Sequence, residues 1–299
     1  MNKTKLKTSL FIVSSFLIPA IMMFFIYLSQ GIYSNSDTSP LLGDGYHQYV
    51  IFDTTLRNIL HGTDSLFYSF QSGLGINFYA LSSYYLGSFF SPLVYFFNAQ
   101  SMPDAVYLIT LLKFGAIGLS TYISLHGMFS KIPRSLVLTL STSFALMSFA
   151  ISQIEIKTWL DVFILAPLIL YGFKKLIYKE GEILYFISLT SLFIQNYYFG
   201  FMMSIFLILW YLTQLSWDIK GIGKRFFHFV IVSLLSVITS LVMLFPTFLD
   251  LRTHGESFSN VDSIFTEKSW YLDVFAKNFI GSFDTTKYGS IPMIYVGLF

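Results

Sequence analysis

The stretch LFIVSSFLIPAIMMFFIYLSQ, residues 10–30, decides the fold class of this chain. It carries no charge, and about 20 apolar residues suffice for a helix to cross the hydrocarbon core of a bilayer. Lys3, Lys5 and Lys7 precede it, as in a secretory signal. Its apolar core is too long for such a signal, however, and no clear small-residue cleavage site follows. We therefore expect an uncleaved first transmembrane helix.

The composition of the whole chain points to the same class. Of its 299 residues, 55% are hydrophobic and 11% are charged, and the mean hydropathy is +0.65. Soluble domains carry about 25% charged residues, so this chain has too little polar surface to be one. Cysteine is absent, which excludes disulfides, thiolate catalysis and Cys-ligated metals. The net charge of +2 is not concentrated on a soluble face and gives no indication of a nucleic-acid partner.

Basic residues set the expected topology. Four clusters hold 11 of the 18 Lys and Arg residues: Lys3, Lys5 and Lys7; Lys131 and Arg134; Lys174, Lys175 and Lys179; Lys220, Lys224 and Arg225. The positive-inside rule places all four clusters, and with them the N-terminus, in the cytoplasm. This requires seven crossings: residues 10–30, 104–129, 135–153, 158–173, a hairpin of two short helices within 183–217 that turns near 195–198, and 226–249.

The crossing count leaves two large outer loops, residues 33–102 and 250–289, in a single polytopic domain that covers 1–299. Residues 65–102 are uncharged but are broken by glycines and by Pro92. We expect this segment to form interfacial or re-entrant helices along the outer leaflet. The alternative, a true span, would invert every later loop. Residues 292–299 resemble the start of an eighth span, so we expect the chain to be truncated at its C-terminus.

The loop LLGDGYHQYVIFDTTLR, residues 41–57, carries the first set of candidate site residues. Asp44 lies between two glycines, where a carboxylate could accept a proton from a hydroxyl or bind a metal. The alternative is a solvated turn residue. His47, Gln48 and Arg57 are candidates for substrate binding, although Asp53 and Arg57 have the i,i+4 spacing of a local helix pair.

A second outer turn, ISQIEIKTWLD (residues 151–161), brings Glu155, Lys157 and Asp161 to the same side as Asp44. Carboxylates from two loops suit a general-base or metal-assisted transfer site, and Lys157 could meet a phosphate together with Arg57. The alternative is that a short outer loop simply needs polar residues. Lys113, near the middle of its span, either has a function or pairs with an internal carboxylate.

Known soluble-type motifs are absent from the sequence. It contains no Walker-type glycine loop, HExxH, GxSxG or paired-cysteine motif, so ATP-driven transport and soluble-type hydrolysis have no support. The histidines at 61, 126, 228 and 254 lack metal-ligand spacing. The sequence thus identifies no cofactor, and leaves a divalent cation open.

Four strings carry a family resemblance: GDGYHQYVIF (43–52), GTDSLFYSFQSGLGINFY (62–79), SSYYLGSFFSPLVYFF (82–97) and QNYYFGFMMSIFLILW (195–210). In their ordered succession the chain resembles the YfhO-type family of bacterial membrane proteins across most of its length. That family is similar to GT-C glycosyltransferases, which use polyprenyl-phosphate sugars outside the cytoplasmic membrane. The resemblance implies a GT-C-like bundle of about seven to eight transmembrane helices, and members typically much longer than this chain.

The resemblance also implies roles for particular residues. In GT-C enzymes a carboxylate of the first outer loop is the main catalytic residue, and Asp44 matches that position. Acidic residues of the second outer loop often assist, which makes Glu155 and Asp161 further catalytic candidates. Gly45 follows Asp44, so the adjacent acidic pair of some GT-C branches is missing.

The expected function is therefore transfer of a sugar from a polyprenyl-phosphate donor to a cell-wall polymer such as teichoic acid, at the outer face of the bacterial cytoplasmic membrane. The acceptor class comes from the family resemblance alone. One alternative is a carrier or flippase for a lipid-linked saccharide, with Lys113 lining its path. A non-enzymatic membrane scaffold is the other.

Overall fold

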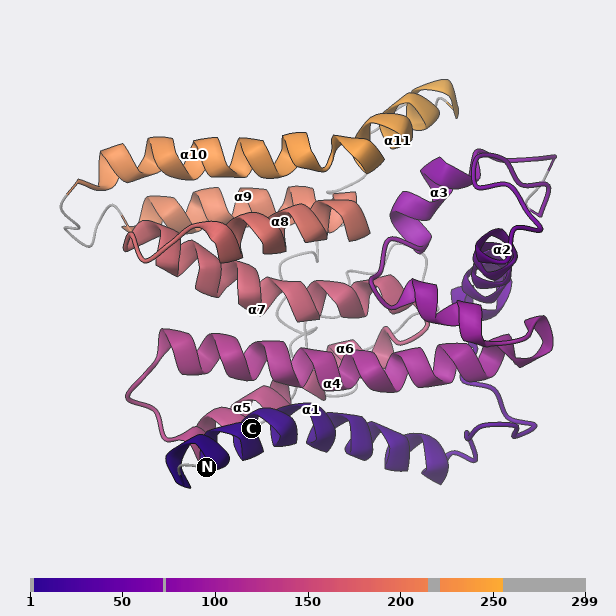
Figure 1. Ribbon diagram of the computed structural model, residues 1–299, viewed down its shortest axis with the longest axis horizontal. Helices are drawn as coiled ribbons and strands as arrows, with labels where there is room; N and C mark the ends of the chain where they lie inside the picture. Colours follow the sequence, from indigo (N-terminus) through magenta and orange to yellow (C-terminus); the bar gives the residue numbers. More distant parts are fainter. Residues whose placement is uncertain (1–2, 72–73, 215–220, 255–299) are drawn as a thin grey trace, which may run out of the picture.

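The computed structural model describes residues 3–71, 74–214 and 221–254, and every regular element within them is a helix. The body of the molecule is a set of roughly parallel helices (Figure 1), among them α1 (Lys3–Ser29), α4 (Met102–Met128), α7 (Lys157–Ile177), α8 (Ile183–Gln195) and α10 (Ile222–Thr239). Helix α4 packs against both α1 and α7, and α7 packs against α8. The expected all-α class is confirmed.

Glycines let neighbouring helices approach closely. A Cβ atom on Gly118 of α4 would lie 2.3 Å from the Ser15 carbonyl of α1, and one on Gly172 of α7 would lie 2.5 Å from the Tyr185 amide of α8. Small residues at such crossings are typical of helix packing in membranes, because backbone contact replaces a hydrophobic driving force. These contacts hold α1, α4, α7 and α8 in one packed row.

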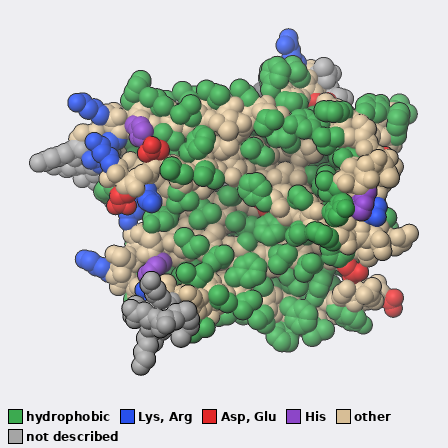
Figure 2. Space-filling model, in the orientation of Figure 1, with side chains coloured by type: hydrophobic (Ala, Val, Ile, Leu, Met, Phe, Trp, Pro, Cys, Tyr) green, Lys and Arg blue, Asp and Glu red, His purple; other side chains and the backbone are tan. Residues whose placement is uncertain are grey.

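The basic clusters lie together at one end of the bundle, which we call the basic end. Figure 1 shows the α4–α5 and α7–α8 connections and the start of α10 at the left, and Figure 2 shows Lys and Arg side chains at that edge of a largely hydrophobic face. Arg134 Nη1 donates to Thr8 Oγ1 at 2.8 Å, which ties the start of α5 (Arg134–Ala145) to α1. The described members of the clusters that the sequence assigns to one side of the membrane therefore share one end of the bundle, while Lys220 lies outside the described residues.

Helix lengths support membrane insertion, but the helices that are long enough to cross a membrane are fewer than the seven crossings that the sequence predicts. Among the described residues, three helices are long and apolar enough to cross a membrane: 8–29, 99–128 and 134–152. A bent pair, 223–239 with 241–252, would make a fourth. Helix α8 and helix α9 (Tyr197–Gln214) are shorter apolar helices that meet at Asn196, where the sequence predicts a turn. Seven crossings remain a prediction.

The last predicted crossing, 226–249, is not one straight helix. It divides at Ser240 into α10 and α11 (Leu241–His254), which are bent by 68°. Pro246 has no N–H to donate to the Val242 carbonyl, and that carbonyl accepts a hydrogen bond from the Tyr79 hydroxyl at 3.0 Å. The bend thereby lays α11 against α3 (Phe78–Tyr85).

Short helices fill residues 33–102 and cap the bundle at the end opposite the basic clusters, which we call the loop end (Figure 1). They are η1 (Gly45–Tyr49), α2 (Val50–Leu60), α3, η2 (Ser91–Phe96) and η3 (Ala99–Ser101). A further short helix, α6 (Ser148–Ser152), precedes α7. In the described part of 65–97 no helix is long enough to span, as the sequence predicts. Most of the predicted second loop, 250–289, lies outside the described residues.

Candidate functional site

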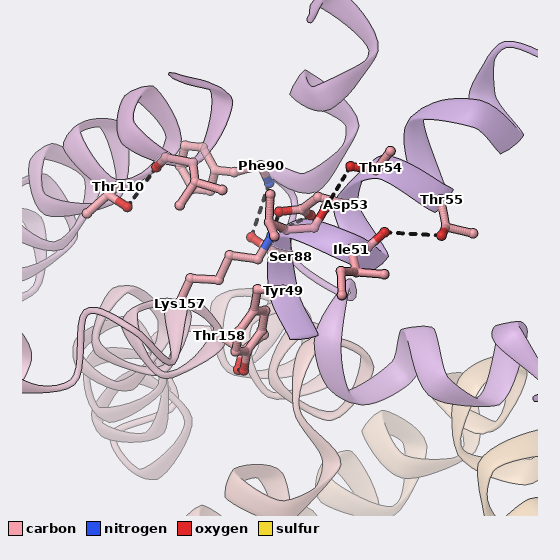
Figure 3. Close-up of polar contacts among 12 residues, drawn as sticks. Tyr49, Ile51, Asp53, Thr54, Thr55, Ser88, Phe90, Thr110, Lys157 and Thr158 are labelled. Atoms are coloured by element: carbon pink, nitrogen blue, oxygen red, sulfur yellow. Dashed lines mark hydrogen bonds and ion pairs between the residues drawn. The ribbon is translucent and has the colours of Figure 1, made fainter. Parts of the chain in front are cut away.

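Four charged side chains from three helices meet inside the bundle near the loop end. Lys113 of α4 forms an ion pair with Asp161 of α7 at 2.7 Å, with side-chain exposures of 0% and 2%. Lys157, on the first turn of α7, reaches Asp53 of α2, and this pair is equally buried (Figure 3). A buried charge is tolerated only when it is paired and hydrogen-bonded, so the four groups form a neutral, mutually dependent set.

Further hydrogen bonds complete this buried charge cluster. Ser88 Oγ donates to Asp161 Oδ1 at 2.9 Å, and Lys113 Nζ donates to the Lys157 carbonyl at 2.9 Å. Thr158 Oγ1 lies 2.9 Å from the Tyr49 hydroxyl. The cluster therefore joins α4, α7, α2 and the segment before η2, and it fixes the loop end on the bundle.

The local pair between Asp53 and Arg57, which was one interpretation of their i,i+4 spacing, does not form. Asp53 faces Lys157, whereas Arg57 Nε donates to the Phe97 carbonyl at 2.7 Å and its Nη1 donates to Asn58 Oδ1 at 3.0 Å. An exposed i,i+4 pair contributes only about 0.2–0.5 kcal/mol. The buried partner on α7 therefore prevails, and the local-pair interpretation was wrong.

The loops that carry Asp44 and Glu155 are far apart in the chain and meet in the structure. A Cβ atom on Gly43 would lie 2.5 Å from Glu155 Oε2, so the Glu155 carboxylate rests on the residue that precedes Asp44. Gly43 also has φ +46°, a conformation that favours glycine. Asp44 is exposed and Glu155 is partly exposed. These two carboxylates are the accessible members of the predicted acidic set.

Tyrosines of η1 and α3 lie near Asp44. The charge of Asp44 acts on the hydroxyls of Tyr49, Tyr84 and Tyr85. Burial raises the pKa of Tyr84 and Tyr85, and the charge of Asp44 raises it further. Both hydroxyls therefore stay protonated at physiological pH and can donate hydrogen bonds.

A cavity of 350 Å³ adjoins these tyrosines between α3, α9 and α11. Its walls combine aromatic rings with polar groups, and include Ser83, Tyr84, Tyr85, Tyr197, Thr247 and Asp250. Tyr84 and Tyr197 lie with ring centroids 6.1 Å apart across it. Concave sites with apolar walls and a few polar groups are typical of small-molecule binding.

Most of the remaining predicted residues lie either beside Asp44 or in the buried charge cluster. His47 and Gln48 lie on η1, directly after Asp44, with His47 exposed and Gln48 partly exposed. Asp161 and Lys157 belong to the buried charge cluster and face protein rather than the surface beside Asp44. Arg57 is partly buried and is held by the Phe97 carbonyl. The structure thus brings Glu155 to Gly43, next to Asp44 in the chain, and places Asp161 in the buried charge cluster.

Sequence reasoning missed Ser88, which carries no charge and belongs to no recognised motif. Its partner on α7 is 73 residues away, so only the fold reveals the contact. It also missed that Lys113 and Lys157 share one cluster. Charged residues are rare within apolar helices, and in the sequence this rarity was the one indication of the cluster. It singles out Lys113 but not its partner Asp161.

The described part of the chain contains no complete set of metal ligands. There, no group of three or more His, Asp or Glu side chains is arranged to hold an ion. Asp44 and Glu155 are the two carboxylates that could contribute oxygen ligands to a divalent cation such as Mg²⁺, which typically keeps several waters.

Comparison with known families identifies the family of this chain. A model of the family described as bacterial membrane protein YfhO matches residues 14–299. The chain belongs to the YfhO family. The family predicted from the four strings is thus confirmed, and with it a membrane location. No curated protein and no solved structure matches this YfhO-family chain.

Proposed function

We propose that this YfhO-family protein is a membrane glycosyltransferase that moves a sugar from a polyprenyl-phosphate donor to an extracytoplasmic cell-wall polymer such as teichoic acid. The observation that carries the proposal is the contact of the Glu155 carboxylate with Gly43, beside the exposed Asp44. Two accessible carboxylates next to an aromatic cavity suit transfer to a hydroxyl acceptor.

Asp44 is assigned as the general base. The acceptor hydroxyl gives its proton to the Asp44 carboxylate while its oxygen bonds to the anomeric carbon, and the polyprenyl phosphate leaves with the electron pair of the broken C–O bond. Glu155 supports this step by orienting the acceptor. General-base catalysis typically contributes about 10²–10⁴-fold.

Binding of the donor phosphate is assigned to the residues nearest Asp44. His47 and Gln48 follow it on η1, and His47 is exposed. Asp161 and Lys157 are assigned to positioning, because both are buried in ion pairs. Arg57 contributes by holding α2 to the Phe97 carbonyl, and its remaining guanidinium donors are available to a phosphate.

The lipid tail of the donor is expected to lie on the segment 65–97, which is rich in Phe and Tyr. Large side chains there are exposed, among them Phe67 at 70%, Phe89 at 65% and Phe96 at 78%. Burial of a hydrocarbon tail gains about 0.8 kcal/mol per methylene. Exposed rings at the loop end therefore suit a long polyprenyl chain.

The test is transfer of a labelled sugar from a polyprenyl-phosphate donor by the purified full chain in proteoliposomes. Asp44→Asn keeps the shape and removes the charge, so transfer should fall by about 10²–10⁴-fold. Asp37→Asn removes an exposed carboxylate from the same loop and should leave transfer unchanged. Normal transfer by Asp44→Asn would contradict the assignment of the base.

The same preparation separates the rival functions. A carrier would move the lipid-linked saccharide across the bilayer without breaking the glycosidic bond, and a scaffold would do neither. Lys113, the residue that suggested a carrier path, is fully buried and held by Asp161 and the Lys157 carbonyl. In this structure it faces protein, which favours the transferase.

A further inference from the structure

A second cavity, of 390 Å³, lies at the basic end, far from the carboxylates of the loop end. It opens between the end of α7 and the beginnings of α8 and α10. Its walls carry three cationic side chains, Lys179, Lys224 and Arg225, and one carboxylate, Glu182. The excess of positive charge makes this cavity complementary to an anion.

Two of these cations are available to a ligand. Lys179 and Lys224 are exposed, and neither forms an ion pair with the residues that the structure describes. Arg225 is oriented by its Nη1, which donates to the Ile177 carbonyl at 2.7 Å. Glu182 faces His228 at 3.9 Å across the mouth of the cavity. The carboxylate is therefore directed at the imidazole, and neither ammonium group is paired with a carboxylate of the described residues.

An apolar strip begins at the edge of this cavity. On α10, His228, Ile231 and Leu235 have the i, i+3, i+7 spacing of one helix face, and Ile231 and Leu235 are 40% and 48% exposed. On the neighbouring α8, Ile183 is 71% exposed and Ile187 is 55% exposed. A cationic pocket with an adjoining exposed hydrocarbon surface fits a ligand that is both anionic and lipidic.

We propose that the cavity at the basic end binds the phosphate headgroup of an anionic phospholipid, whose acyl chains lie along α8 and α10. Basic pockets between helices at a membrane surface are suited to such headgroups. A free phosphate would use the same cations but would gain nothing from the apolar strip. The inference is independent of glycosyl transfer, because the cavity and Asp44 lie at opposite ends of the bundle.

The experiment measures retention of lipid by the full chain purified in neutral detergent. Native mass spectrometry should detect bound phosphatidylglycerol, and added phosphatidylglycerol should raise the thermal midpoint more than phosphatidylcholine does. Lys179→Gln and Lys224→Gln should each weaken retention roughly five-fold. Lys131→Gln removes a charge at the same end but outside the cavity, and should have no effect.

A second pair of variants separates a lipid from a free anion. Leu235→Ser and Ile187→Ser alter only the exposed strip, and should weaken retention of phosphatidylglycerol while leaving the effect of inorganic phosphate unchanged. Equal retention by wild type and the two lysine variants would overturn the site. Stabilisation by inorganic phosphate equal to that by phosphatidylglycerol would overturn the lipid as its ligand.

Discussion

Asp53 and Lys157 lie 104 residues apart in the chain and form an ion pair whose side chains are 0% and 2% exposed. Asp53 belongs to the short helix α2, and Lys157 begins the long helix α7. Next to it, Lys113 and Asp161 join α4 to α7. The loop end is thus attached to the bundle through charges, and the proposed carboxylate pair lies on the surface that these charges hold in place.

Asp53→Asn should lower the free energy of unfolding by about 3–5 kcal/mol, because it leaves the buried Lys157 ammonium without its counter-charge. Thermal unfolding in detergent, followed by intrinsic fluorescence, measures the change. Asp37→Asn, an exposed carboxylate of the same segment, should shift the stability by no more than about 0.5 kcal/mol. The double variant Asp53→Leu/Lys157→Met should recover most of the loss; a double variant as unstable as the single one would refute this explanation.

Ser88→Ala should destabilise the protein by about 1.5–3 kcal/mol, the usual contribution of a hydrogen bond to a charged group. The hydroxyl donates to Asp161 Oδ1, so its removal leaves that carboxylate short of one donor. Ser91 is the matched control, since it is 2% exposed and its hydroxyl has no partner within the described part of the chain. Ser91→Ala should therefore be nearly neutral in the same unfolding assay, and equal losses for both variants would contradict the role of Ser88.

Gly43→Ala should reduce sugar transfer at least tenfold while the protein still accumulates in the membrane. The new Cβ atom would displace the Glu155 carboxylate from its place beside Asp44. Gly62→Ala isolates the backbone effect, because Gly62 has φ +76° and open space around it. Both substitutions carry the cost of a left-handed backbone, about 1–2 kcal/mol, but only the first reaches Glu155. Equal activity of the two variants would exclude the proposed dependence on that contact.

Membrane orientation can be measured with single cysteines, because the native chain has none. Cysteine at Asp44 should react with an impermeant thiol reagent in intact cells, whereas cysteine at Lys131 or Glu180 should react only after permeabilisation. All three positions are exposed, so a lack of labelling does not arise from burial. Labelling of position 131 in intact cells would reverse the proposed sides.

Several features of the fold were predictable because they depend on local sequence. The apolar runs around residues 10–30 and 104–129 correspond to α1 and α4, and the predicted turn near 195–198 contains Asn196, whose side chain accepts from the Phe199 amide at 3.1 Å. The bend at Ser240 was not predicted. It depends on the packing of α11 against α3, and a proline within an apolar run does not by itself specify a 68° angle.

The candidate site likewise combines features that the sequence predicts with features that only the fold reveals. The sequence alone determined that the protein belongs in a membrane, and it predicts that the cationic clusters share one side and that Asp44 and Glu155 occur in loops that can meet, since run lengths and charge order are properties of the linear chain. Only the tertiary structure decided that Asp53 pairs with Lys157 instead of Arg57, and that Asp161 is buried against Lys113. A lysine at the first turn of a helix opposes the helix dipole, so local preference would not place Lys157 there. Its position is stabilised by the Asp53 carboxylate, which only the placement of α2 at the loop end of the bundle brings within reach.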